Sequence, residues 1–220
     1  MSPTRPRALR AERAVFRKVF RRLESRGLLL ESDAELPSVT SLVIGSPIRG
    51  SWWGHPRGRE IFRVMVQLAA RPDVIPTKLV SDKVTFVHRG LWPALLAVAT
   101  SGEPWQFAGI SSAARSLLKE VLRQGSLRTD RLADMRRREG KTIGASAREL
   151  ERRLLVYSEQ VHTESGAHAK QLESWDHWAQ RRQVAAAPIA VQRAKELLEQ
   201  AVRSFAQRAR AAAQLPWQVK

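Results

Sequence analysis

One order of sequence patterns occurs twice in the chain: three stretches with helical periodicity, followed by two adjoining stretches that read as strands. The clearest helical stretch is 111–125, which Gly125 ends. Its apolar residues fall on one helical face, at Ala114, Leu117, Leu118, Val121 and Leu122. Because a helix or a hairpin buries only one side, the elements of each copy must pack around a shared core.

The next two helices of this copy are predicted from their capping signals. Thr129 is expected to cap a second helix, with Asp130 in its first turn. A third helix is predicted over 146–155, because Ser146 and Glu149 have the S-x-x-E spacing of a capping box.

Each copy ends in a predicted hairpin. In the second copy the strands are joined by residues 164–166, and in the first copy the strands within 74–89 turn at Ser81-Asp82. Three helices precede the first hairpin, over 8–27, 36–45 and 58–73, and a short apolar helix or turn follows it over 90–102.

The sequence therefore predicts an α+β protein, mostly α, built from two units of three helices and a hairpin plus a C-terminal helix. The expected boundaries are 1–102, 103–180 and 181–220. The C-terminal helix, over 188–215, has one apolar stripe. This stripe is expected either to dock on the body of the protein or to form a homodimer with a second copy.

Three short helices followed by a hairpin resemble the winged helix-turn-helix DNA-binding proteins. In that family the third helix enters the major groove and the hairpin, or wing, touches the DNA backbone. The resemblance implies that 146–155 is a recognition helix. The tandem order is also similar to that of the tandem winged-helix DNA glycosylases, whose chains are longer and whose catalytic Gln-x-Gln motif is absent here.

The net charge of +17 favours a polyanionic partner, with nucleic acid ahead of an anionic membrane surface. Each quarter of the chain is net positive, so no single tail holds the charge. Arginine, which outnumbers lysine, suits bidentate contacts to phosphate and guanine.

The predicted recognition helix carries the first group of candidate DNA-binding residues. Arg148, Arg152 and Arg153 lie off its apolar stripe, where base or phosphate contacts would be made. The alternative is a solvated face on which these arginines pair with neighbouring glutamates. Three further candidates lie at or before its start: Lys141, Thr142 and Ser146.

A second candidate footprint lies in the first copy. Arg57, Arg59 and Arg63 lead into or lie on the helix over 58–73. Lys78 and Lys83 flank the hairpin turn and would contact phosphates.

The stretch SWWGHPRGRE, residues 51–60, has three open interpretations. Alternation along an extended chain would put one of its two tryptophans in the core and the other at the surface. They would fill a structural gap, or form an aromatic–arginine surface that stacks a base, or accompany a reactive His55. The expected role is a structural joint with a rim that faces nucleic acid.

Several function classes are excluded or disfavoured. The chain has no cysteine, so disulfides and thiolate chemistry are excluded. It has no phosphate-binding loop, dinucleotide fingerprint or serine elbow. His162 and His168 are expected to face each other across the second hairpin, as surface residues rather than as metal ligands. No catalytic residue, metal or cofactor is predicted.

The predicted function is that of a DNA-binding regulator or architectural factor acting on duplex DNA. A DNA-processing enzyme, of a repair glycosylase or nuclease type, is the alternative, and a protein–protein scaffold is a third. A cytoplasmic location without membrane insertion is expected, because no apolar run is long enough to span a bilayer and the basic start lacks an apolar signal region.

Overall fold

The computed structural model describes residues 5–132, 142–162, 168–184, 188–206 and 213–219. Helices predominate and the described strands form two small antiparallel sheets, so the predicted α+β class, mostly α, is confirmed. The chain divides into two compact units. One comprises Met1–Trp92 with Glu196–Leu215, and the other comprises Pro93–Lys195 with Pro216–Lys220.

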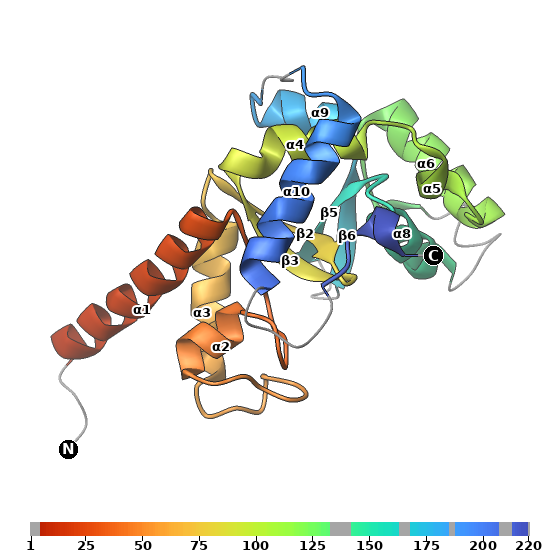
Figure 1. Cartoon of the computed structure of the whole chain (residues 1–220). Coiled ribbons are helices and arrows are strands. Elements are labelled where there is room, and N and C mark those ends of the chain that lie inside the picture. The colour runs from red at the N-terminus through yellow and green to blue at the C-terminus, as the bar shows by residue number, and fades with distance from the viewer. Residues whose placement is uncertain (1–4, 133–141, 163–167, 185–187, 207–212, 220) are drawn as a thin grey trace. The chain divides into compact units, whose positions relative to one another are not determined.

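The first unit follows the order helix, strand, helix, helix, hairpin (Figure 1). Its elements are α1 (Arg5–Arg26), β1 (Leu28–Leu30), α2 (Val39–Ile44), α3 (Gly58–Ala69), β2 (Val74–Val80), β3 (Lys83–His88) and the short 3-10 helix η1 (Arg89–Leu91). The sheet order is β1-β3-β2, with both pairs antiparallel. The three leucines of β1 are fully buried and form the centre of the core with Val19 and Leu23 of α1.

The predicted turn of the first hairpin is confirmed. Val80 pairs with Lys83, and the two residues between them, Ser81 and Asp82, both have positive φ angles, of 51° and 57°. This conformation matches the twist of the two strands that it joins. The turn is also held by Gln214, whose carbonyl oxygen accepts a hydrogen bond of 2.7 Å from the Ser81 amide.

The second unit repeats the strand arrangement of the first. Its elements are α4 (Trp92–Ala99), which begins at the last residue of the first unit, α5 (Pro104–Phe107), α6 (Ser112–Gln124), β4 (Ser126–Arg128), the 3-10 helix η2 (Thr129–Arg131), α8 (Thr142–Arg152), β5 (Tyr157–His162), β6 (His168–Glu173) and α9 (Trp175–Arg181). The sheet order is β4-β6-β5. The core packs α6 and α8 on the sheet through Leu117, Val121, Leu150 and Leu172.

The second hairpin has the predicted register, in which His162 pairs with His168. The predicted loop residues 164–166 lie outside the described residues. Helix α6 ends at Gln124 before Gly125, as predicted, although Leu122 is exposed rather than part of the buried face.

The prediction that Thr129 caps a helix is wrong. Residues 126–128 form strand β4, and Arg128 is the residue before the 3-10 turn that Thr129 begins. The Thr129 hydroxyl accepts a hydrogen bond from the Lys170 amide, at 3.0 Å, on the neighbouring strand. The Thr129 hydroxyl, which the local sequence pattern predicted to cap a helix, therefore binds the sheet instead.

The predicted capping box at Ser146 and Glu149 is also wrong. Helix α8 begins at Thr142, so Ser146 lies in its interior and is buried. Glu149 instead accepts hydrogen bonds from the amide and hydroxyl of Ser111, at 2.9 and 2.7 Å. Ser111 is the N-cap of α6, so the acid of the predicted box supports a different helix.

The C-terminal segment does not form a unit of its own. Helix α10 (Val191–Ala206) and the turn η3 (Pro216–Gln218) are divided between the two units. In the first unit, Leu198, Val202 and Phe205 are buried within the single chain, and Arg26 donates to the Ser204 carbonyl at 3.0 Å. The apolar stripe therefore docks on the body of the protein, and pairing with a second copy through it would require it to be uncovered.

Candidate nucleic-acid interface

Helix α8 presents Arg148 and Arg152 on one exposed face, as their spacing of four predicts. The neighbouring glutamates, which were the alternative partners, bind other elements. Glu149 is bound to Ser111 of α6. The buried Glu151 accepts hydrogen bonds from the Ser158 hydroxyl and the Lys170 ammonium group. The exposed face of α8 carries two guanidinium groups, and Glu149 and Glu151 also connect this helix to α6 and to the sheet.

The remaining candidates around α8 do not share this exposed face. Arg153 is half-buried and donates through Nη1 to the Trp105 carbonyl oxygen at 2.8 Å, so it supports the packing of the second unit. Ser146 is buried. Thr142 is the first residue of α8, and Lys141 lies outside the described residues.

The three arginines predicted for the first unit have different surroundings. Arg57 precedes α3 and forms a fork with Glu60, with N–O distances of 2.8 and 2.9 Å, which raises the pKa of the guanidinium. Arg59 is exposed in the first turn of α3 and pairs with none of the described acidic residues. Arg63 is exposed and forms an ion pair with the partly exposed Glu12 of α1.

The two hairpin lysines are both close to acids. The Lys78 ammonium group lies 3.8 Å from the Asp82 carboxylate at the turn. Lys83 donates to the buried Asp33 at 2.5 Å. Burial alone would raise the pKa of Asp33, but the hydrogen bonds from Lys83 and from two backbone amides outweigh it and lower the pKa. The Lys83 ammonium group is therefore paired with a buried carboxylate of the protein itself.

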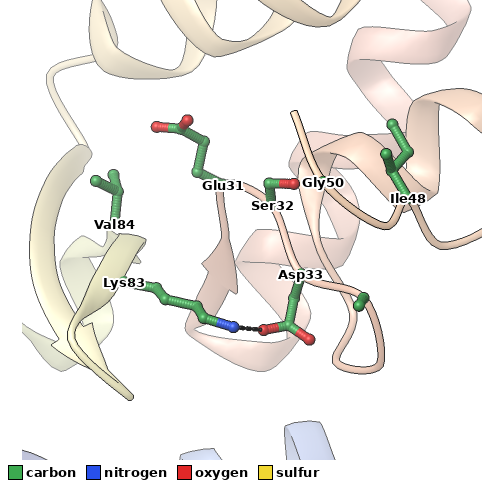
Figure 2. A pocket seen from close by; sticks show the side chains of 8 residues that line it. Glu31, Ser32, Asp33, Ile48, Gly50, Lys83 and Val84 are labelled. Carbon is green, nitrogen blue, oxygen red and sulfur yellow. Dashed lines mark hydrogen bonds and ion pairs between the residues drawn. The ribbon is translucent and has the colours of Figure 1, made fainter. Parts of the chain in front are cut away.

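The two residues of this ion pair line a pocket of about 410 Å³ (Figure 2). Its lining residues come from the segment after β1, from the loop after α2 and from β3: Glu31, Ser32, Asp33, Ala34, Ile48, Gly50, Lys83 and Val84. In Figure 2 the Glu31 carboxyl lies apart from the Lys83–Asp33 pair. Burial raises the pKa of Glu31, and a hydrogen bond from Trp52 opposes part of that rise. Sequence reasoning did not single out Glu31, because no local motif marks it.

One tryptophan of SWWGHPRGRE is buried and the other is exposed, as predicted, but alternation along an extended chain is not the cause, because the segment is a turn in which the His55 amide donates to the Trp52 carbonyl. Trp52 is 6 % exposed and Trp53 is 67 % exposed. Their rings are stacked, with centroids 4.2 Å apart and planes inclined by 21°. His55 accepts a hydrogen bond from the Arg57 amide through Nδ1, at 3.1 Å, so the described geometry gives it a role in the turn before α3.

A second pocket, of about 570 Å³, lies between α1 and α3. It is lined by Arg10, Arg13, Phe16, Arg17 and Gln67. The sequence showed that the first helix is basic, but it did not show which of its cations the fold would gather beside α3. Helical spacing from Arg10 through Arg13 to Arg17 was the available signal.

No group of three or more His, Cys, Asp or Glu residues suited to hold a metal ion occurs in the described part of the chain. No helix among the described residues is long and apolar enough to cross a membrane.

No protein-family model matches the chain, and neither a curated protein nor a solved structure matches it.

Proposed function

We propose that the protein binds duplex DNA through exposed cationic helix faces, as a regulator or architectural factor. The observation that carries the proposal is the face of α8, where the side chains of Arg148 and Arg152 are exposed one helical turn apart. An exposed helix face with two guanidinium groups attracts phosphate and offers hydrogen-bond donors to base edges.

The order of elements supports the same proposal. In each unit the helix directly before the hairpin, α3 or α8, occupies the position of the recognition helix in the winged helix-turn-helix family that the chain resembles. The net charge of +17 adds a general attraction to the DNA backbone.

Fluorescence anisotropy with a labelled duplex, measured across a salt series, tests the proposal. Affinity is expected to fall steeply with salt, with a logarithmic slope of about −0.9 for each phosphate neutralised. The double variant Arg148→Ala/Arg152→Ala should weaken binding by about 1–3 kcal/mol for each arginine that contacts a base.

A matched control separates the α8 face from the overall charge. Arg123→Ala/Arg203→Ala removes the same charge from exposed arginines of α6 and α10. The control should bind DNA nearly as well as the wild type. If the two double variants lose the same affinity, the loss is due to the lower net charge and not to the face of α8. A wild-type protein that binds no duplex at low salt would refute the proposal.

The alternative, a DNA-processing enzyme, has one observation in its favour. Glu31 is a carboxyl with a raised pKa in the pocket beside Lys83, and such a group can donate or accept a proton nearer neutral pH. Analysis of DNA products in the binding samples tests it. A product that forms with the wild type and not with Glu31→Gln would establish this alternative, and intact DNA in every sample would reject it.

A further inference from the structure

The exposed surface on and beside α3 carries large apolar side chains, which contacts to DNA phosphates do not need. The three large apolar side chains exposed there are Trp53, Phe62 and Val66, at 67, 48 and 49 %. The other large apolar residues exposed in the described part of the chain, Phe107, Leu122 and Val219, come from separate elements. Scattered apolar residues are normal at a surface, whereas a cluster marks an interaction site.

The ring of Trp53 is held in place on one side. Its neighbour Trp52 is buried and stacked against it at 4.2 Å, and Phe62 lies 5.7 Å away with its plane tilted by 40°. Although Trp52 covers one face of the Trp53 indole, most of the Trp53 side chain stays exposed to solvent. A rigid aromatic face of this kind binds another flat ring at little cost in side-chain entropy.

The border of this aromatic surface is cationic. Arg59 lies on the exposed side of α3, one turn before Phe62 and Arg63. Glu60, the acid of that turn, is held by the fork from Arg57. An anionic occupant is therefore favoured over a neutral or cationic one.

The cationic border continues into the pocket between α1 and α3. Gln67 follows Arg63 by one helical turn and lines that pocket with Arg10, Arg13 and Arg17. Phe16, in the same pocket, offers a second aromatic ring beside these guanidinium groups. Aromatic rings alternating with arginines suit a strand whose bases and phosphates alternate in the same way.

We infer that Trp53 and Phe62 stack unpaired bases of a DNA strand whose phosphates are held by Arg59 and by the arginines of α1. The inference rests on the proposed function and deepens it, since it names DNA with unpaired nucleotides as the preferred ligand of the first unit. Inside a duplex both faces of a paired base are covered by its stacked neighbours, so an unpaired base offers Trp53 a face that an internal paired base does not.

Anisotropy measurements with a blunt duplex and with the same duplex carrying a single-stranded overhang test this inference. The wild type is expected to bind the overhang DNA more tightly. Trp53→Ala should weaken binding to the overhang DNA by about 5- to 160-fold, the range expected for one base stack, and leave binding to the blunt duplex nearly unchanged. Trp53→Phe should restore most of the preference, and Phe62→Ala should reduce it.

Phe107→Ala is the matched control, because it removes an exposed aromatic ring from α5 in the second unit. It should bind both DNAs like the wild type. Trp53→Ala should still unfold cooperatively and only slightly below the wild-type temperature, since the side chain is mostly exposed and loses only its contacts with Trp52 and Phe62.

The outcomes separate the two proposals. If the wild type binds neither DNA, the proposed function fails. If the wild type binds the two DNAs equally, or if Trp53→Ala keeps the preference for the overhang DNA, base stacking on Trp53 is refuted while duplex binding stands. If Trp53→Ala abolishes a self-association of the wild type and leaves both DNA affinities unchanged, the aromatic surface is a protein interface and the inference is overturned.

Discussion

The two units share a scaffold but differ in what the helix before the hairpin exposes. In both, a helix leads through a glycine into a short strand, and that strand pairs with the second strand of the hairpin. Helix α3 exposes Phe62 and Val66 among its arginines, whereas the corresponding side of α8 exposes Gly144, Ala145, Arg148 and Arg152. The same backbone order thus supports an aromatic surface in one unit and an almost purely cationic one in the other.

The aromatic residues show the same contrast. In the second unit, Tyr157, Trp175 and Trp178 are buried and in contact, with ring centroids 5.7 to 5.9 Å apart. In the first unit, only Trp52 of the stack with Trp53 and Phe62 is buried. These three rings of the second unit serve its core, whereas Trp53 and Phe62 of the first unit leave much of their area exposed.

The largest expected effect tests this difference. Trp178→Ala should lower the free energy of unfolding by about 3–5 kcal/mol, because it removes a fully buried ring and leaves a cavity. Trp53→Ala should lower that free energy by only about 0.5–1.5 kcal/mol, because its ring is mainly exposed and loses only its contacts with Trp52 and Phe62. Urea-induced unfolding followed by far-UV circular dichroism measures both, and similar losses in the two variants would remove the contrast.

The next effect tests what the units share. Gly27 and Gly125 both have φ angles of +76°, where an L side chain is strained by about 1–2 kcal/mol. A Cβ atom would lie 2.6 Å from Leu91 Cδ1 at Gly27 and 2.8 Å from His177 Cδ2 at Gly125. Each Gly→Ala variant should therefore lose about 2 kcal/mol of stability or more, measured by the same urea unfolding.

A third glycine provides the control for that pair. Gly109 also has a positive φ, of 67°, but a Cβ atom there would meet nothing within 4 Å. Gly109→Ala should cost only the backbone strain and so lose less than the other two. A loss as large as theirs would mean that the contacts with Leu91 and His177 contribute nothing.

A smaller effect concerns acid stability in the second unit. Burial would raise the pKa of Glu173, but hydrogen bonds from Arg181 and His177 outweigh it, so the folded pKa lies below the ordinary value of 4.5. A lowered pKa gives stability that is present above pH 4.5 and is lost as the pH falls through the folded value.

Glu173→Gln should therefore be less stable than the wild type at neutral pH by about 1–3 kcal/mol. The gap should narrow as the pH falls from 4.5 through the lower folded pKa, because in this range the unfolded chain takes up a proton before the folded protein does. Thermal unfolding over a pH series measures it. A gap that stays constant across the series would show that the charge of Glu173 contributes no pH dependence.

The smallest effect has the opposite sign and belongs to the first unit. Because burial raises the pKa of Glu31, its contribution to stability is full below pH 4.5 and is lost as the pH rises through the folded value. Glu31→Gln, which keeps an oxygen to accept the Trp52 hydrogen bond, should be more stable than the wild type at neutral pH by less than about 1 kcal/mol. The same pH series measures this gain, and a loss of stability at neutral pH would contradict it.

Much of the fold followed from local patterns along the sequence. The face of α6 and its end at Gly125 needed only helical periodicity and a glycine, and the turn at Ser81 and Asp82 needed only its position between two apolar runs. The exposed pair Arg148 and Arg152 was also predictable, because a spacing of four residues places two side chains on one helical face.

The strands β1 and β4 were not predicted, because three residues are too few to show a period of two. Each is a strand only because it pairs with the distant second strand of its hairpin. The two failed helix caps have the same origin. Thr129 and Glu149 accept hydrogen bonds from Lys170 and Ser111 on other elements, and these bonds take the place of the predicted helix caps.

The sequence by itself determined the helices α1, α2, α3, α6 and α10, the two hairpins and the excess of positive charge. All of these depend on neighbours within a few residues or on composition alone. Only the tertiary structure decided which cations are paired within the fold, since Lys83 and Arg153 donate to Asp33 and to the Trp105 carbonyl, whereas Arg59 and Arg148 pair with none of the described residues. The availability of a charge depends on partners that are distant along the chain, and folding alone brings those partners together.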